Sequence, residues 1–190
     1  MKKLPILLAL AFISVLFLQS CEEVTYPRPR GYPRIDLPTH SYLKYDNPSC
    51  PFSLEYPEGM KAMNESGDSC IVDFYWPEYD FYWHMTYRHI PTSGKTRMQH
   101  EDEYRKLVMK HTIKMSHLNE LVLEGENGDG ILYEVFGEVG APAQMIYGDS
   151  THLLMTAFYF EEAINQDSLS PLIEHVKEDM RHMAGSITWK

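Results

Sequence analysis

The sequence predicts a single α+β domain in which an antiparallel β-sheet is covered by two amphipathic helices, in the order βββαββββα. Short runs rich in aromatic and β-branched residues alternate with turn signals, a pattern typical of strands. Turn-length links join consecutive runs, which favours hairpins and therefore antiparallel pairing. Two further stretches repeat apolar residues at three- and four-residue steps, so each predicts a helix that buries one stripe on the sheet.

The first 20 of the 190 residues have the layout of a signal peptide. Lys2 and Lys3 precede an apolar run, Leu4–Leu18, that is shorter than the ~20 residues a membrane-spanning helix needs. Residues 18–21 resemble a bacterial lipobox, because a small residue stands directly before Cys21. We therefore expect removal of residues 1–20 and lipidation of Cys21, which would anchor the mature chain without a spanning helix.

The chain is acidic, with a formal net charge of −10, and loss of two lysines with the signal peptide makes the mature chain more acidic still. This charge disfavours non-specific binding to nucleic acid or to anionic lipid surfaces. Residues 49–190 suffice for one hydrophobic core, so we expect one globular domain there, preceded by a lipidated tether over residues 21–48.

Prolines punctuate the predicted tether, most densely between residues 27 and 33. Proline fixes φ and disfavours helix, so this stretch is expected to run extended. Guanidinium and aromatic groups on a stiff backbone also suit a protein or carbohydrate surface, because little entropy is lost when they bind. A simple spacer and a partner-binding segment both remain open, the second through Arg28, Arg30, Tyr32 and Arg34.

Two cysteines remain besides the lipidation site, Cys50 and Cys70. An exported protein reaches an oxidising compartment, where this pair can form a structural disulfide. The alternative is two buried free thiols. A metal site or a redox pair is disfavoured because neither cysteine belongs to a CxxC motif.

The first half of the domain reads as three strands followed by a helix. The strands are Phe52–Tyr56, Ile71–Trp76 and Phe81–Tyr87. Thr96 then stands three residues before Gln99, the spacing of a capping box, and apolar residues recur at helical steps beyond it. This pattern predicts a helix from there to about His117.

The second half reads as two hairpins and a final helix. Each hairpin has glycine in its turn, where a positive φ is needed. The helix has Ser170 as its N-cap and Pro171 in its first turn, and it ends before Gly185. The four hairpin strands are Leu121–Glu124, Ile131–Phe136, Met145–Tyr147 and His152–Phe160.

The aromatic runs 74–76 and 81–83 exceed the needs of a plain core. Neighbouring side chains on a strand point to opposite faces, so some of these rings either form an exposed binding patch or belong to a sheet covered on both faces. We leave both interpretations open.

No pattern indicates a catalytic or metal site. His175, Asp179 and His182 share one face of the final helix, but without further ligand spacing we favour a solvated polar face. Ser150 and His152 lack a nucleophile elbow and read as turn residues. Residues 126–130 resemble a calcium loop only faintly, because the twelfth position is a glycine, and are read as a hairpin turn.

The proline- and arginine-rich segment 27–38 resembles the gliding motility lipoprotein GldD family. Cys21, Asp149-Ser150, the aromatic run 158–160 and the terminal Thr188-Trp189-Lys190 extend the resemblance over essentially the whole chain. The resemblance implies a Bacteroidota-type envelope lipoprotein that is required for surface gliding and linked to the type IX secretion machinery. Only Cys21 carries over as a site residue, for lipidation. The element order is also similar to PsbP- and Mog1-type sandwiches, an analogy that implies no activity.

We therefore expect a non-enzymatic assembly or stabilising component of the gliding and type IX secretion machinery, without metal or cofactor. Its expected partners are the membrane, through the lipid, and other gliding or secretion proteins of the envelope, but not nucleic acid. The expected location is the outer membrane, facing the periplasm. Two alternatives are a ligand- or glycan-binding module that uses the aromatic strands, and an envelope hydrolase.

Overall fold

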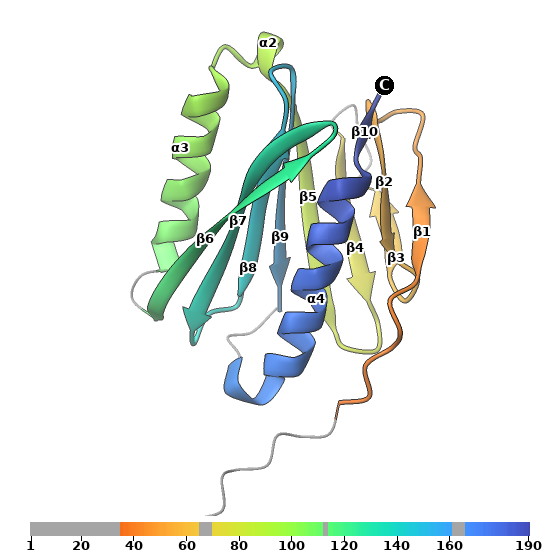
Figure 1. Ribbon diagram of the computed structural model, residues 1–190, viewed down its shortest axis with the longest axis vertical. Coiled ribbons are helices and arrows are strands. Elements are labelled where there is room, and N and C mark those ends of the chain that lie inside the picture. Colours follow the sequence, from red (N-terminus) through yellow and green to blue (C-terminus); the bar gives the residue numbers. More distant parts are fainter. Residues whose placement is uncertain (1–34, 65–69, 112–113, 161–165) are drawn as a thin grey trace, which may run out of the picture. The chain divides into compact units, whose positions relative to one another are not determined.

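The computed structural model describes residues 35–64, 70–111, 114–160 and 166–190, which form two antiparallel sheets and three α-helices (Figure 1). The larger sheet has seven strands, and every neighbouring pair in it is antiparallel. From edge to edge the strands are β3 (Lys61–Asn64), β4 (Ile71–Trp76), β5 (Phe81–His89), β9 (His152–Tyr159), β8 (Ala143–Gly148), β7 (Gly128–Gly137) and β6 (Met115–Gly125).

The smaller sheet has three strands, in the order β1 (Tyr42–Tyr45), β2 (Phe52–Pro57) and β10 (Thr188–Trp189). Pairing of β10 with β2 brings the last residues of the chain beside the first strands of the domain. The three helices and the short 3-10 helix that follows the second of them are α2 (Ile90–Ser93), α3 (Arg97–Val108), η1 (Met109–His111) and α4 (Gln166–Ser186).

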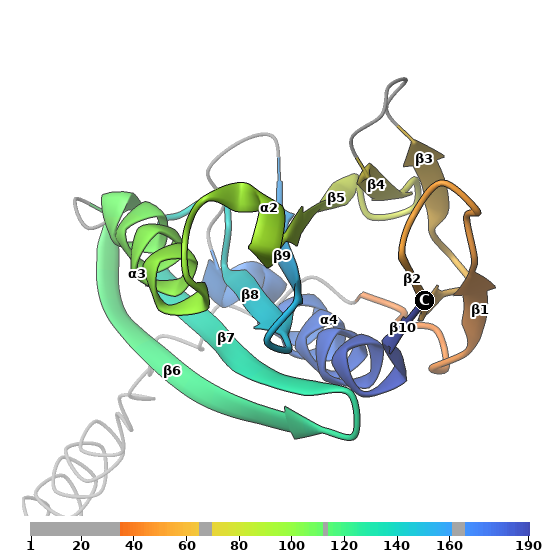
Figure 2. The ribbon, with the colours of Figure 1, turned by 90° about the horizontal axis from the view of Figure 1, so that it is seen from above.

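The two long helices pack on opposite faces of the large sheet (Figure 2). Tyr104 of α3 packs in one buried cluster with Tyr133 and Ile146 of the sheet. Leu132 and Met145 are their neighbours along the same strands, so they point to the other face and pack in the cluster that includes α4. The small sheet shares that second face with α4, because β2 contributes to the same cluster.

The α+β class and the antiparallel pairing are confirmed, whereas the predicted order βββαββββα is wrong. The structure adds β1, β3, β10 and α2, each of four residues or fewer. Elements this short contain too few residues to show a periodicity. The two main helices also lie on opposite faces of the sheet, because the chain crosses one face between β5 and β6 and the other between β9 and β10.

The end of the expected tether belongs to the folded domain. β1, at residues 42–45, pairs with β2 along its full length. Ahead of it, Ile35 and Leu37 pack against the main hydrophobic core. The segment from residue 35 onward is therefore anchored on the domain, although it precedes the predicted boundary at residue 49.

The predicted helix to about His117 is wrong at its C-terminal end. Its N-terminus is confirmed, since Thr96 and Gln99 form both bonds of a capping box. The helix ends at Val108, however, and Met115 already begins β6, which pairs with β7. Met115 and Leu118 lie on this strand and pack against the buried cluster that contains Tyr104 of α3. Apolar residues at helical spacing therefore reach the core here from a strand.

The final helix is longer than predicted at both ends. It begins at Gln166, so Ser170 is not its N-cap and Pro171 lies inside it, near the start. It continues through Gly185, whose φ is not positive, to Ser186. The Ser186 hydroxyl donates to the carbonyl of Met183 at 2.8 Å and so satisfies one of the last carbonyl groups.

The aromatic residues of β4 and β5 alternate between the buried core and a partly exposed face of the sheet. Phe74, Trp83 and their neighbours at every second position are buried against the α4-side core. Tyr75 and Tyr82 point to the opposite face and are only partly buried. The core interpretation is therefore confirmed for the buried rings, whereas a binding patch formed by the partly exposed rings stays a prediction.

Cys50 and Cys70 are joined by a disulfide, with Cα atoms 5.5 Å apart and a sequence separation of 20. Replacement of both cysteines by alanine is expected to lower the free energy of unfolding by about 3 kcal/mol, because the bond restricts the unfolded chain. Urea unfolding of the two proteins under oxidising conditions measures the difference. A loss below about 1 kcal/mol would contradict this expectation.

Candidate functional site

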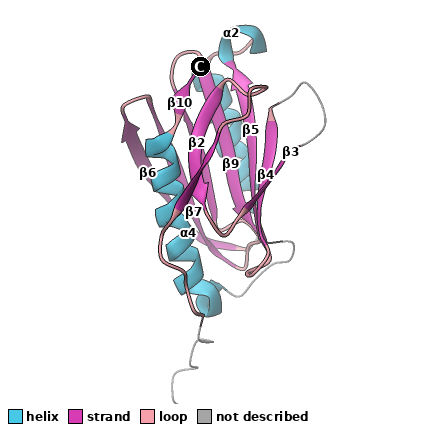
Figure 3. Cartoon of the chain, turned by 90° about the vertical axis from the view of Figure 1, so that its right-hand side faces the viewer, coloured by secondary structure: helices cyan, strands magenta, loops and turns pink. Residues whose placement is uncertain are grey.

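A polar row on α4 faces the protein interior rather than solvent. Asp179 is 1 % exposed and His175 is 8 % exposed. His182, whose side chain is 38 % exposed, agrees with the favoured interpretation of a solvated face, but that interpretation is wrong for Asp179 and His175. They are covered by the loop that precedes β1, which passes across α4 (Figure 3).

Asp179 is the centre of this cluster. Its Oδ1 lies 2.6 Å from His40 Nδ1 and accepts a hydrogen bond of 2.9 Å from the Tyr42 hydroxyl. Its Oδ2 has no hydrogen-bond partner among the described residues, and His175 Nε2 lies 3.7 Å from it. One carboxylate thus ties α4 to two residues at the entry of the domain.

Ring stacking strengthens the same contact. His40 stacks on His175 with ring centroids 4.0 Å apart and an interplanar angle of 13°. Tyr42 stacks on His182 at 3.7 Å, and His182 Nε2 lies 2.7 Å from an oxygen of Glu55 on β2. The α4 residues therefore bind the loop, β1 and β2 together.

The two stacked histidines have opposite pKa shifts. The hydrogen bond with Asp179 raises the pKa of His40, and burial opposes this effect. Burial lowers the pKa of His175; the Asp179 carboxylate opposes this shift, and the charge of His40 adds to it. The cluster thus favours a protonated His40 beside a neutral His175, which avoids stacking two cations.

A small cavity adjoins the cluster. It has a volume of about 20 Å³ and is lined by His40, His175 and Asp179, with Trp76 and Gly59 among its other walls. A volume of this size holds about one water molecule or one ion. The arrangement can therefore bind a single small polar group between three side chains.

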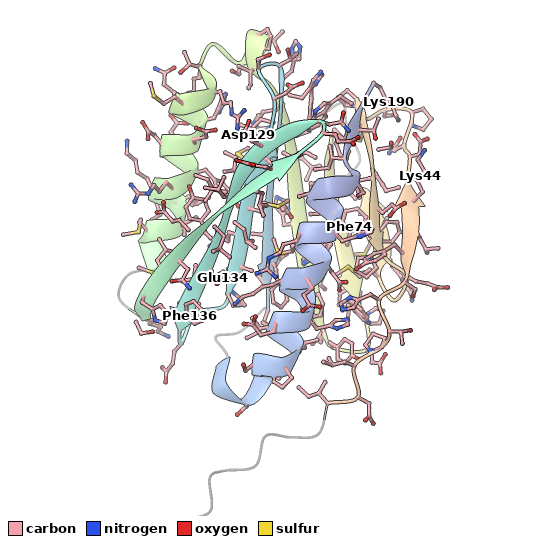
Figure 4. All side chains as sticks on the ribbon, viewed as in Figure 1. Lys44, Phe74, Asp129, Glu134, Phe136 and Lys190 are labelled. Carbon is pink, nitrogen blue, oxygen red and sulfur yellow. A yellow bond between two sulfur atoms is a disulfide. The ribbon has the colours of Figure 1, made fainter. Side chains whose placement is uncertain are left out.

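A second buried ionic group lies further along α4, against β7. Lys177 is 2 % exposed, and its Nζ lies 2.8 Å from Glu174 and 3.4 Å from Glu134. The ammonium group also stands 4.8 Å from the centre of the Phe136 ring, on the same face of β7 as Glu134 (Figure 4). These contacts satisfy the lysine as part of the packing of α4.

Three tyrosines form a row across the opposite face of the large sheet. Tyr75, Tyr82 and Tyr159 occupy paired positions on β4, β5 and β9. Their rings stack in succession, with centroids 4.6 Å and 5.5 Å apart. All three are partly exposed, so the row presents aromatic surface outside the main core.

Asp149, Ser150 and His152 lie where β8 is connected to β9. Asp149 accepts hydrogen bonds from the backbone N–H groups of Thr151 and His152, so it shapes a turn. The His152 ring pairs through Nδ1 with the Tyr87 hydroxyl at 2.7 Å. Ser150 lies in this turn, as expected, whereas His152 is already the first residue of β9.

The turn at residues 126–130, which resembles a calcium loop only faintly, contacts residues 187 and 189. The side-chain amide of Asn127 donates to the carbonyl of Ile187 at 2.8 Å. The Asn127 carbonyl accepts from the Trp189 indole at 2.7 Å. This turn is therefore a docking point for β10.

Comparison with protein families gives a match to the gliding motility lipoprotein GldD over residues 22–189. The chain belongs to the GldD family. Membership gives it a role in gliding motility and associates it with the cell envelope. The matched range begins directly after Cys21 and includes the α4 cluster and the tyrosine row.

Among solved structures, the chain is similar to cyanobacterial PsbP (CyanoP) from Synechocystis sp. PCC 6803. The two share 13 % identity with a TM-score of 0.44, over 83 % of this chain and 98 % of the other. No match was found among curated proteins.

The lipidation residue Cys21 and the tether residues Arg28, Arg30, Tyr32 and Arg34 lie outside the described residues. Within the described ranges, no helix combines the length and apolar character needed to cross a membrane. The predicted cysteine pair is bonded, and the helix residues His175, Asp179 and His182 lie together. Their partners His40 and Tyr42 carried no signal in the sequence.

Proposed function

We propose that this GldD-family chain is a non-enzymatic assembly or stabilising component of the gliding and type IX secretion machinery. It is lipidated on Cys21 and attached to the outer membrane, facing the periplasm. The family match carries the link to gliding. The buried Asp179 supports a mechanical role, because it fastens the entry of the domain to α4 through two hydrogen bonds.

These contacts suit a protein that is held to a membrane by its N-terminal segment and has to bear force there. The chain between the lipid and the domain enters at residue 35, packs on the core through Ile35 and Leu37, and then forms β1. Any pull on the lipid would therefore reach α4 and β2 through several contacts at once.

Capture of the tagged protein from gently cross-linked envelopes tests the proposal. We expect gliding or secretion proteins to be identified with it by mass spectrometry, and to be lost when the bait carries Cys21→Ser. A bait that yields no protein partner, or the same partners without the lipid, would contradict an anchored assembly role.

A non-enzymatic role also predicts that the hydrolase-like residues are dispensable. Ser150→Ala and His152→Ala should leave gliding unchanged, because the Asp149 side chain holds the turn through backbone N–H groups that both substitutions keep. Colony spreading and cell tracking measure the effect. Loss of gliding in a folded, normally abundant Ser150→Ala protein would favour the hydrolase alternative.

The tyrosine row favours one second candidate, a module that binds an envelope glycan or other ligand. The three tyrosines place partly exposed aromatic rings and hydroxyl groups side by side on one sheet face, and such amphipathic groups can contact a sugar ring. Saturable binding on a glycan array that Tyr82→Ala abolishes would support it. Absence of saturable binding would remove it.

A further inference from the structure

We propose that His40, His175 and Asp179 form a binding site for one zinc ion. Their candidate ligand atoms all lie within 4.8 Å of one another. Two imidazoles and one carboxylate are a donor set that zinc accepts in proteins, with a fourth position left for water or another ligand. This inference rests on the geometry of the cluster and does not depend on the proposed function.

The helix supplies two of the three ligands in suitable positions. Residues four apart on a helix share one side, and His175 Nε2 lies 3.7 Å from Asp179 Oδ2. Two ligands at about 2.0–2.1 Å from a tetrahedral ion stand about 3.3 Å apart. A closure of a few tenths of an ångström would therefore place both atoms on one ion.

The second observation is the unsatisfied oxygen of the carboxylate. Asp179 is 1 % exposed, and its Oδ2 has no hydrogen-bond partner within the described part of the chain. A buried charged oxygen in this state needs a water molecule or an ion. The cavity of about 20 Å³ that the three side chains line has room for one such group.

His40 completes the site by turning its ring. An ion lies in the plane of each imidazole that binds it, so it cannot serve both rings while they are stacked at 13°. The His40 side chain is 35 % exposed and lies on the loop before β1, so its ring can turn toward the ion if it gives up the stack on His175. His40 would bind the ion through Nδ1 and release to solvent the proton that this nitrogen holds against Asp179 Oδ1, while Asp179 would bind the ion through Oδ2.

Charge also favours a divalent cation here. Glu178 Oε2 lies 3.0 Å from His40 Nε2, so a second carboxylate stands beside Asp179 at the mouth of the site. Two carboxylates balance the charge of Zn²⁺ when both imidazoles are neutral. The bound ion would link the loop before β1 directly to α4.

Equilibrium dialysis of the mature lipoprotein in detergent, after treatment with a chelator, tests the site. We expect one zinc per chain at low micromolar free zinc, measured by atomic absorption. His40→Ala and His175→Ala should each weaken binding at least about tenfold. His84→Ala is the matched control, because His84 pairs with Asp73 at 2.7 Å and belongs to no three-ligand group in the described ranges; it should retain the zinc.

Failure to retain zinc would mean that the cavity holds only water, and it would overturn the proposal. Equal binding by wild type and His175→Ala would place the zinc elsewhere and overturn it as well. Because a variant can misfold, hydrogen exchange of the wild type gives an independent result. Zinc should slow exchange in residues 40–45, and unchanged exchange there would contradict the site.

Discussion

A Cys21→Ser chain is expected to abolish gliding. If Cys21 carries the lipid, as proposed, the variant loses its anchor, and the net negative charge of the chain disfavours binding to anionic lipid surfaces in its place. Fractionation should move the protein from the membrane to the soluble envelope fraction. Cell tracking on a surface should then show no directed movement.

The other two cysteines provide the matched control. Replacement of both Cys50 and Cys70 by serine removes the disulfide but leaves the lipid site intact. This variant should stay in the membrane fraction, with gliding reduced only as far as its lower stability reduces its abundance. Normal gliding by a soluble Cys21→Ser protein would show that the anchor is dispensable.

Strand positions were predictable wherever a run was long and bounded by turn residues. β4, Ile71–Trp76, matches its predicted bounds, since proline follows it and alternate residues reach a buried face. The end of α3 was not predictable in the same way. Met115 and Leu118 continue the helical spacing of Tyr104 and Val108, yet they reach the same core from a strand. Spacing alone does not distinguish these two routes to burial.

The sequence indicated the helix residues of the candidate site but not their partners on the loop and β1. His175, Asp179 and His182 share a helix face, which their spacing shows directly. Burial of that face depends on His40 and Tyr42, which stand 139 and 137 residues from Asp179. No local pattern connects residues this distant, so the polar row looked like a solvated surface. Only the tertiary structure shows that β1 and its preceding loop cover it.

Removal of both partners of Asp179 is expected to destabilise the domain strongly. In the His40→Ala/Tyr42→Phe double variant, a carboxylate that is 1 % exposed loses the two hydrogen bonds to its Oδ1. A buried charge without its partners costs about 3 kcal/mol or more in the free energy of unfolding. Urea unfolding with a chelator present measures the loss without any contribution from a bound ion.

Two comparisons distinguish the cost of a buried carboxylate without partners from the cost of shortening a side chain. His84→Ala removes a histidine from an aspartate at nearly the same distance, 2.7 Å, but the side chains there are 42 % and 23 % exposed, so we expect less than about 1 kcal/mol. Addition of Asp179→Asn to the double variant should recover about 1 kcal/mol or more, because a neutral amide is easier to bury than a carboxylate. If that third substitution instead destabilised the protein further, the buried charge would not be the source of the loss, and Asp179 would stabilise α4 by contacts other than those with His40 and Tyr42.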